Sequence, residues 1–119
     1  MRGFLAVVAD AALVLVFVLI GRHAHHVSGG LAGLVSIAWP FLAGLGIGEL
    51  AARSWRRPAA IAPTGVIVWL STVAGGMTLR VLAGQGTTIV FIAVALAFLG
   101  LFLLGWRVAV KLLPVIAGR

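Results

Sequence analysis

Residues 89–104 read IVFIAVALAFLGLFLL, with no charged or proline residue to interrupt the apolar run. A helix needs about 20 mostly apolar residues to cross a bilayer core of roughly 30 Å. Three further apolar runs precede this one, at residues 3–21, 31–52 and 65–84, and we place the end of the fourth near residue 106. Because every backbone group in lipid must be hydrogen-bonded and four strands cannot close a barrel, the runs predict an all-α, polytopic protein with four transmembrane helices.

Composition extends this interpretation to the whole chain. The 119 residues are 63% hydrophobic and only 9% charged, which lies outside the range of soluble domains. We therefore expect one integral membrane domain over residues 1–119. The basic residues sit at the edges of the apolar runs, which predicts the lipid bilayer as partner and excludes nucleic acid. The absence of cysteine excludes disulfides, thiolate metal sites and a cysteine nucleophile.

The distribution of Lys and Arg predicts the orientation. Seven of these residues fall on one side of the four runs, and only Arg22 and Arg80 fall on the other. The positive-inside rule then places both termini and the middle loop in the cytoplasm, in a multi-pass protein of the cytoplasmic membrane. Trp55, Trp69 and Trp106 are expected near the cytoplasmic boundary as an aromatic belt. Thr64 and Thr88 precede the third and fourth runs and are predicted helix N-caps.

Small residues recur at spacings that let helix backbones approach closely. Gly44 and Gly48 form a G-x-x-x-G pair in the second run, and we expect Gly76 and Gly100 to pack against other helices as well. In the fourth run Ala93, Ala97 and Gly100 form a small stripe that we expect to face the bundle. An alternative is that the second run, which contains Pro40, acts as a hinge or lines a substrate path.

Asp10 is the strongest single indication of chemistry, because an ionised carboxylate inside the bilayer is costly unless it is paired, hydrated or neutralised. It is either half of a buried ion pair or a proton- or cation-binding group in a transporter. The best partner is Arg107. Side chains tilt toward a helix's N-terminus, so Asp10 on the first helix and Arg107 on the fourth should lean toward each other.

Two other charged residues lie within or beside the runs. Glu49 precedes Arg53 by four residues, so an interfacial ion pair accounts for it. Arg80 either extends to the outer head groups or holds an anionic group in an outward cavity beside Thr72 or Thr78. His23, His25 and His26 lie in a short outer loop that lacks a carboxylate, so we expect neither a metal site nor any cofactor.

Several segments resemble a known family: residues 38–44, residues 63–65 followed by 68–70, residues 75–80 and the closing Gly105-Trp106-Arg107. They are similar to an uncharacterised family of small membrane proteins, known mainly from actinobacteria and catalogued as the domain of unknown function 3054. The resemblance covers nearly the whole chain and implies the four-helix fold. It implies no activity and no catalytic residue.

The small multidrug resistance exporters offer an architectural comparison, since they also have four helices and an acidic residue in the first. They use glutamate where this chain has Asp10, and the charge asymmetry here argues against an antiparallel homodimer. We therefore expect a non-enzymatic accessory or structural membrane component, associated with other subunits or with itself. The alternative is a small proton-coupled transporter that uses Asp10.

Overall fold

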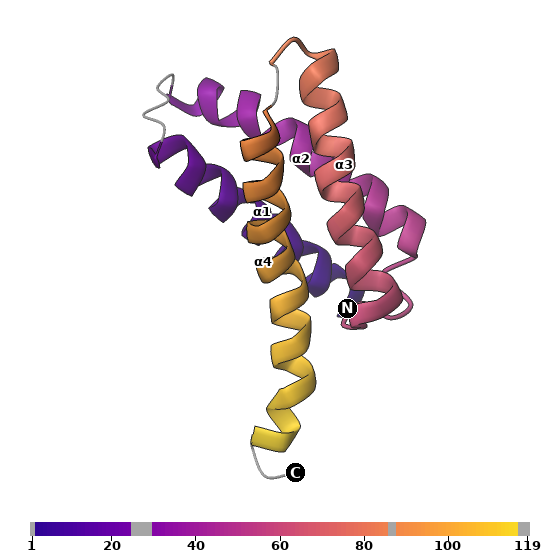
Figure 1. Ribbon diagram of the computed structural model, residues 1–119. Coiled ribbons are helices and arrows are strands. Elements are labelled where there is room, and N and C mark those ends of the chain that lie inside the picture. Colours follow the sequence, from indigo (N-terminus) through magenta and orange to yellow (C-terminus); the bar gives the residue numbers. More distant parts are fainter. Residues whose placement is uncertain (1, 25–29, 86–87, 117–119) are drawn as a thin grey trace.

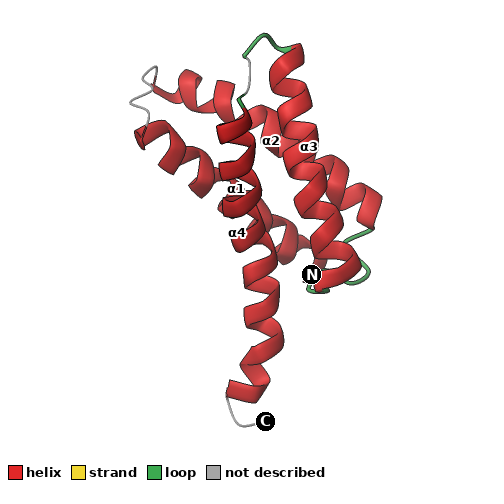
Figure 2. Cartoon of the chain, viewed as in Figure 1, coloured by secondary structure: helices red, strands yellow, loops and turns green. Residues whose placement is uncertain are grey.

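The computed structural model describes residues 2–24, 30–85 and 88–116, and every regular element in these ranges is helical (Figure 2). The main helices are α1 (Arg2–Ala24), α2 (Gly30–Ala52), α3 (Val66–Leu82) and α4 (Ile89–Ile116). A short π-helical turn, η1 (Ile61–Gly65), leads into α3. Each of the four contains or joins an apolar segment long enough to cross a membrane, as the sequence predicts.

The boundaries differ from expectation mainly in α4, which continues ten residues past the predicted end at 106. Arg107 and Lys111 end the purely apolar run, but neither breaks a helix, so the backbone continues to Ile116. The last part of α4 extends past the other helices (Figure 1). Thr88 caps α4 as predicted, because its Oγ1 accepts a hydrogen bond from the Phe91 N–H at 3.1 Å. Thr64 is no cap: it lies inside η1, and Gly65 precedes α3 without a side-chain cap.

Glycines bring α2 and α3 into the most extensive helix contact of the bundle. A Cβ added at Gly44 would lie 2.9 Å from the Gly76 backbone nitrogen and 3.0 Å from the carbonyl oxygens of Ser71 and Thr72. One added at Gly48 would lie 3.1 Å from the Val68 Cα. These distances are shorter than van der Waals contact, so only glycine allows the two backbones to lie this close.

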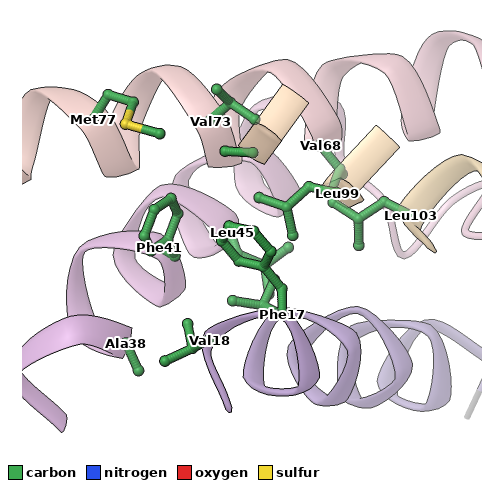
Figure 3. Packing of buried hydrophobic residues seen from close by; sticks show 12 residues of the cluster. Phe17, Val18, Ala38, Phe41, Leu45, Val68, Val73, Met77, Leu99 and Leu103 are labelled. Atoms are coloured by element: carbon green, nitrogen blue, oxygen red, sulfur yellow. The ribbon is translucent and has the colours of Figure 1, made fainter. Parts of the chain in front are cut away.

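The apolar core lies where all four helices meet (Figure 3). It is formed by Val14, Phe17, Phe41, Leu45, Val68, Leu99 and Leu103, among others. Gly76 leaves room for the Phe41 ring and Gly100 leaves room for the Trp69 indole, which donates its N–H to the Leu96 carbonyl at 3.0 Å.

One packing prediction needs correction. The inner face of α4 carries Ala95, Leu99, Leu103 and Arg107, whereas Ala93 and Ala97 are exposed. Large side chains therefore fill the space against α1 and α3, and the two alanines point outward. The half-buried Trp69 and Trp106 donate their indole N–H groups to acceptors within the bundle.

Candidate functional site

Asp10 and Arg107 form the ion pair expected from the sequence, at the end of the bundle that holds the α2–α3 connection. The Arg107 Nη2 lies 2.8 Å from Asp10 Oδ2, and its Nη1 lies 3.0 Å from Oδ1. Both side chains are fully buried. This two-point geometry fixes the planes of both groups and makes the hydrogen bonds stronger than neutral ones.

Further contacts hold the pair in place. Arg107 also donates from Nε to the Pro58 carbonyl at 2.9 Å and from Nη1 to the Leu103 carbonyl at 2.8 Å. The Trp106 indole donates to Asp10 Oδ1 at 2.7 Å, and its ring lies 4.5 Å from the Arg107 guanidinium carbon. A Cβ at Gly65 would lie 2.9 Å from the Arg107 Cδ, so that glycine makes room for the arginine. The pair thus ties α1 to α4 and to the segment before α3.

Glu49 is placed differently from expectation. The predicted ion pair with Arg53 does not form, because α2 ends at Ala52 and Arg53 turns into the left-handed region with a φ of 50°. Glu49 instead turns inward and is only 5% exposed. Neither of its carboxylate oxygens has a hydrogen-bond partner among the described residues, and the same holds for the buried Ser54 hydroxyl.

The electrostatic neighbours of Glu49 are Asp10 from α1, Arg107 from α4 and Ser54 from the turn that follows α2. On α3, the residues packed against this part of α2 are Val68 and Ser71, neither of which is ionisable. We call Asp10, Glu49, Ser54, Trp106 and Arg107 the charged cluster. Its two carboxylates face one guanidinium, so a proton or another monovalent cation is needed to balance the buried charge.

Arg80 lies at the opposite end of the bundle, on the wall of a cavity of about 540 Å³. Its guanidinium carbon sits 4.7 Å from the centre of the Phe91 ring, and its Nη1 donates to Gln85 Oε1 at 3.2 Å. Gln85 in turn donates to the Ser36 carbonyl at 3.0 Å. Thr72 and Thr78, the companions proposed from the sequence, do not line the cavity: Thr72 bonds the Val68 carbonyl of its own helix, and Thr78 is exposed.

The histidine loop falls largely outside the described residues. His25, His26 and the side chain of His23 lie outside the part of the chain that the structure describes. Among the described residues no group of three or more His, Cys, Asp or Glu side chains could hold a metal ion.

Sequence reasoning missed several members of these sites. The Pro58 carbonyl and the Trp106 indole join the ion pair only through tertiary packing. A sequence signal for Glu49 existed: it follows the apolar Leu45 by four residues and so lies on the same face of the helix. The four-residue spacing between Glu49 and Arg53 instead indicated an ion pair at the membrane interface.

Comparison with protein families matches residues 7–110 to the family described as Protein of unknown function (DUF3054). The match covers most of the chain, and the protein belongs to this family. Comparisons with curated proteins and with solved structures find no match.

Proposed function

We propose that this member of the DUF3054 family is a small, non-enzymatic transporter of the cytoplasmic membrane that couples protonation of Glu49 to movement of a solute. The observation that carries the proposal is the Glu49 carboxyl, which is buried and whose two oxygens have no hydrogen-bond partner within the described part of the chain. Burying an ionised carboxylate without a hydrogen-bond partner costs more free energy than a purely structural contact would contribute. Ionisable groups inside a membrane domain mark ion or proton pathways.

Asp10, the residue favoured by sequence alone, suits the proton-carrying role less well. Both of its oxygens are already held by hydrogen bonds from Arg107 and Trp106. Neither Glu49 oxygen is held by a guanidinium or an indole in this way, so its carboxyl is the one free to exchange a proton. In this proposal the Asp10–Arg107 pair stays formed while Glu49 gains and loses a proton.

The test is solute movement in proteoliposomes with an imposed pH gradient, using two fluorescent lipophilic ions: cationic ethidium and anionic anilinonaphthalene sulfonate. Wild type should move one of them at a rate that depends on the gradient, and Glu49→Gln should lose that dependence while staying folded. Arg56→Gln, which alters an exposed arginine, is the matched control. Gradient-driven movement that survives in Glu49→Gln would refute the assignment, and immobility of both ions would refute transport of such solutes.

A spectroscopic measurement tests the proton on Glu49 directly. The infrared spectrum of the wild type in lipid should contain a carboxylic-acid C=O band that shifts in deuterated water. The band should be absent from Glu49→Gln and present in Arg56→Gln, which leaves the charged cluster intact. Its persistence in Glu49→Gln would place the proton elsewhere.

The proposed orientation keeps both termini and the α2–α3 connection in the cytoplasm. Single cysteines report on this cleanly, because the wild type has none. An impermeant maleimide applied to intact cells should label Ala83→Cys and leave Arg56→Cys unlabelled, since both positions are exposed. Ser54 is unsuitable because it is buried. The reverse pattern would invert the topology, and labelling at both positions would indicate insertion in both directions.

A second candidate function is an accessory subunit, favoured by the part of α4 that extends past the other helices (Figure 1). Val108, Val110 and Leu112 are exposed there and offer an apolar surface to another protein. Purification from the native membrane in mild detergent separates the candidates. Stoichiometric foreign subunits favour the accessory role, and a clean homo-oligomer favours the transporter.

A further inference from the structure

We propose that the cavity beside Arg80 binds an amphiphile with one anionic head group and an apolar tail. As the identity of the transported solute this rests on the proposed function, whereas the binding site itself rests on the cavity alone. The volume of about 540 Å³ lies within the range of sites that hold small organic molecules, roughly 300–1,000 Å³.

The cavity wall is chemically divided. Most of its lining is apolar, and Phe17, Phe41 and Phe91 stand together there, with ring centres 5.6 to 6.3 Å apart. Arg80 is the one charged side chain among the described lining residues, and no acidic residue lines the cavity. A hydrocarbon tail gains from burial against the rings. A cationic head would be repelled by the guanidinium, and an uncharged head would gain less from it than an anionic one.

The Arg80 guanidinium is held in a defined position on the cavity wall. It rests on the Phe91 ring, and its Nη1 is held by Gln85, which is itself tied to the α2 backbone at Ser36. A guanidinium carries five N–H donors in a fixed plane and suits both carboxylate and phosphate. Stacking on the ring holds this plane in position, so an incoming head group meets an ordered donor set.

The position of the cavity supports entry of such a molecule. The lining residues Gly21, Arg80 and Thr88 lie near the ends of α1, α3 and the start of α4, at the end of the bundle opposite the charged cluster. In the proposed orientation this is the outer end, where anionic head groups of membrane amphiphiles lie. The two sites are thus separated along the bundle, one for the proton and one for the amphiphile.

The experiment measures thermal unfolding of the protein in nanodiscs of phosphatidylcholine, which carries no net charge. Oleate should raise the melting temperature in a concentration-dependent way, because a ligand that binds only the folded state stabilises it. Oleyl alcohol and oleylamine, which share the tail, should not. Equal stabilisation by oleate, oleyl alcohol and oleylamine would overturn the proposal, because the site would then recognise only the hydrocarbon tail.

Three variants locate the binding. Arg80→Gln should weaken oleate binding at least about tenfold, the effect of one lost charge-assisted contact. Val94→Trp should block it by filling the cavity from α4, and it keeps the test valid if Arg80→Gln does not fold. Arg56→Gln, an exposed arginine at the other end, should bind as wild type does. Unchanged oleate binding in Val94→Trp would place the site elsewhere.

Two further arms identify the source of the head group and separate the two proposals. If the natural occupant is a bilayer lipid, nanodiscs containing phosphatidylglycerol should leave that lipid bound to purified wild type and not to Arg80→Gln. If it is a free amphiphile, oleate should still bind fully in those nanodiscs. Glu49→Gln should bind oleate unchanged. Oleate binding by wild type without any gradient-driven movement of an anion would refute the transporter and leave this site standing.

Discussion

Two arginines near helix ends show how differently one residue type is used at the two ends of this bundle. Arg107 is fully buried and donates to both Asp10 oxygens and to the carbonyls of Pro58 and Leu103. Arg80 lies on an aromatic ring, bonds the amide of Gln85 and borders a cavity. Both guanidiniums stack on an aromatic side chain, but only Arg107 is packed on all sides.

The difference teaches where this fold is rigid and where it can accept a ligand. At the charged cluster, Arg107 donates four hydrogen bonds to groups on three segments and so holds α1 against α4. At the cavity, large aromatic side chains leave space that the backbone does not close. The cluster should therefore dominate stability, and the cavity should dominate ligand binding.

The largest expected effect tests this contrast directly. Arg107→Leu leaves a buried carboxylate beside Glu49 without its cation and should cost about 3 to 5 kcal/mol in the free energy of unfolding in detergent. Arg80→Leu, the matched change at the other end, should cost only about 1 kcal/mol, the scale of a partly exposed cation–π contact. Similar losses for both would erase the distinction between the two ends.

Coupling is measured by adding Asp10→Asn. The double variant Asp10→Asn/Arg107→Leu should lose much less stability than the sum of the single variants, because removal of both charges leaves no unpaired ion. Additive losses would show that the ion pair seen in the structure is not energetically coupled.

The next effect concerns the helix interface that joins the two ends. Gly44→Ala should cost about 2 kcal/mol, because the new Cβ meets backbone atoms of α3 that cannot move singly. Gly46→Ala, two residues away, faces open space and should be neutral or slightly stabilising. Melting curves in detergent compare the two. A loss at Gly46 as large as that at Gly44 would mean that the close α2–α3 contact does not set the effect.

The smallest effect compares the two aromatic rings that lie against the arginines, Trp106 beside Arg107 and Phe91 beside Arg80. Trp106→Phe removes the indole donor to Asp10 Oδ1 while keeping a ring, and should cost about 1.5 kcal/mol, near the lower end for a bond to a charged acceptor. Phe91→Leu removes only the ring under Arg80 and should cost about 0.5 to 1 kcal/mol. Equal costs would show that the indole N–H adds nothing beyond the ring.

The sequence alone was sufficient for the all-α architecture, because its composition predicts a bilayer as solvent and a bilayer admits only helices or closed barrels. Four helices long and apolar enough to cross a membrane follow directly from runs such as residues 89–104. It was also sufficient for the Asp10–Arg107 pair, since two charges inside apolar runs have few partners to choose between. The close-packed faces of Gly44 and Gly48 follow from their four-residue spacing.

Only the tertiary structure decided which local pairs form and which face of each helix is inside. Glu49 has Arg53 at the right spacing, but the left-handed turn at Arg53 ends α2 and leaves Glu49 facing Asp10 and Arg107. Ala93 and Ala97 look like a packing stripe, yet Leu99 and Leu103 take the interior because the space against α1 and α3 needs volume. Periodicity identifies that a helix has faces, but the helices packed around it determine which face is buried.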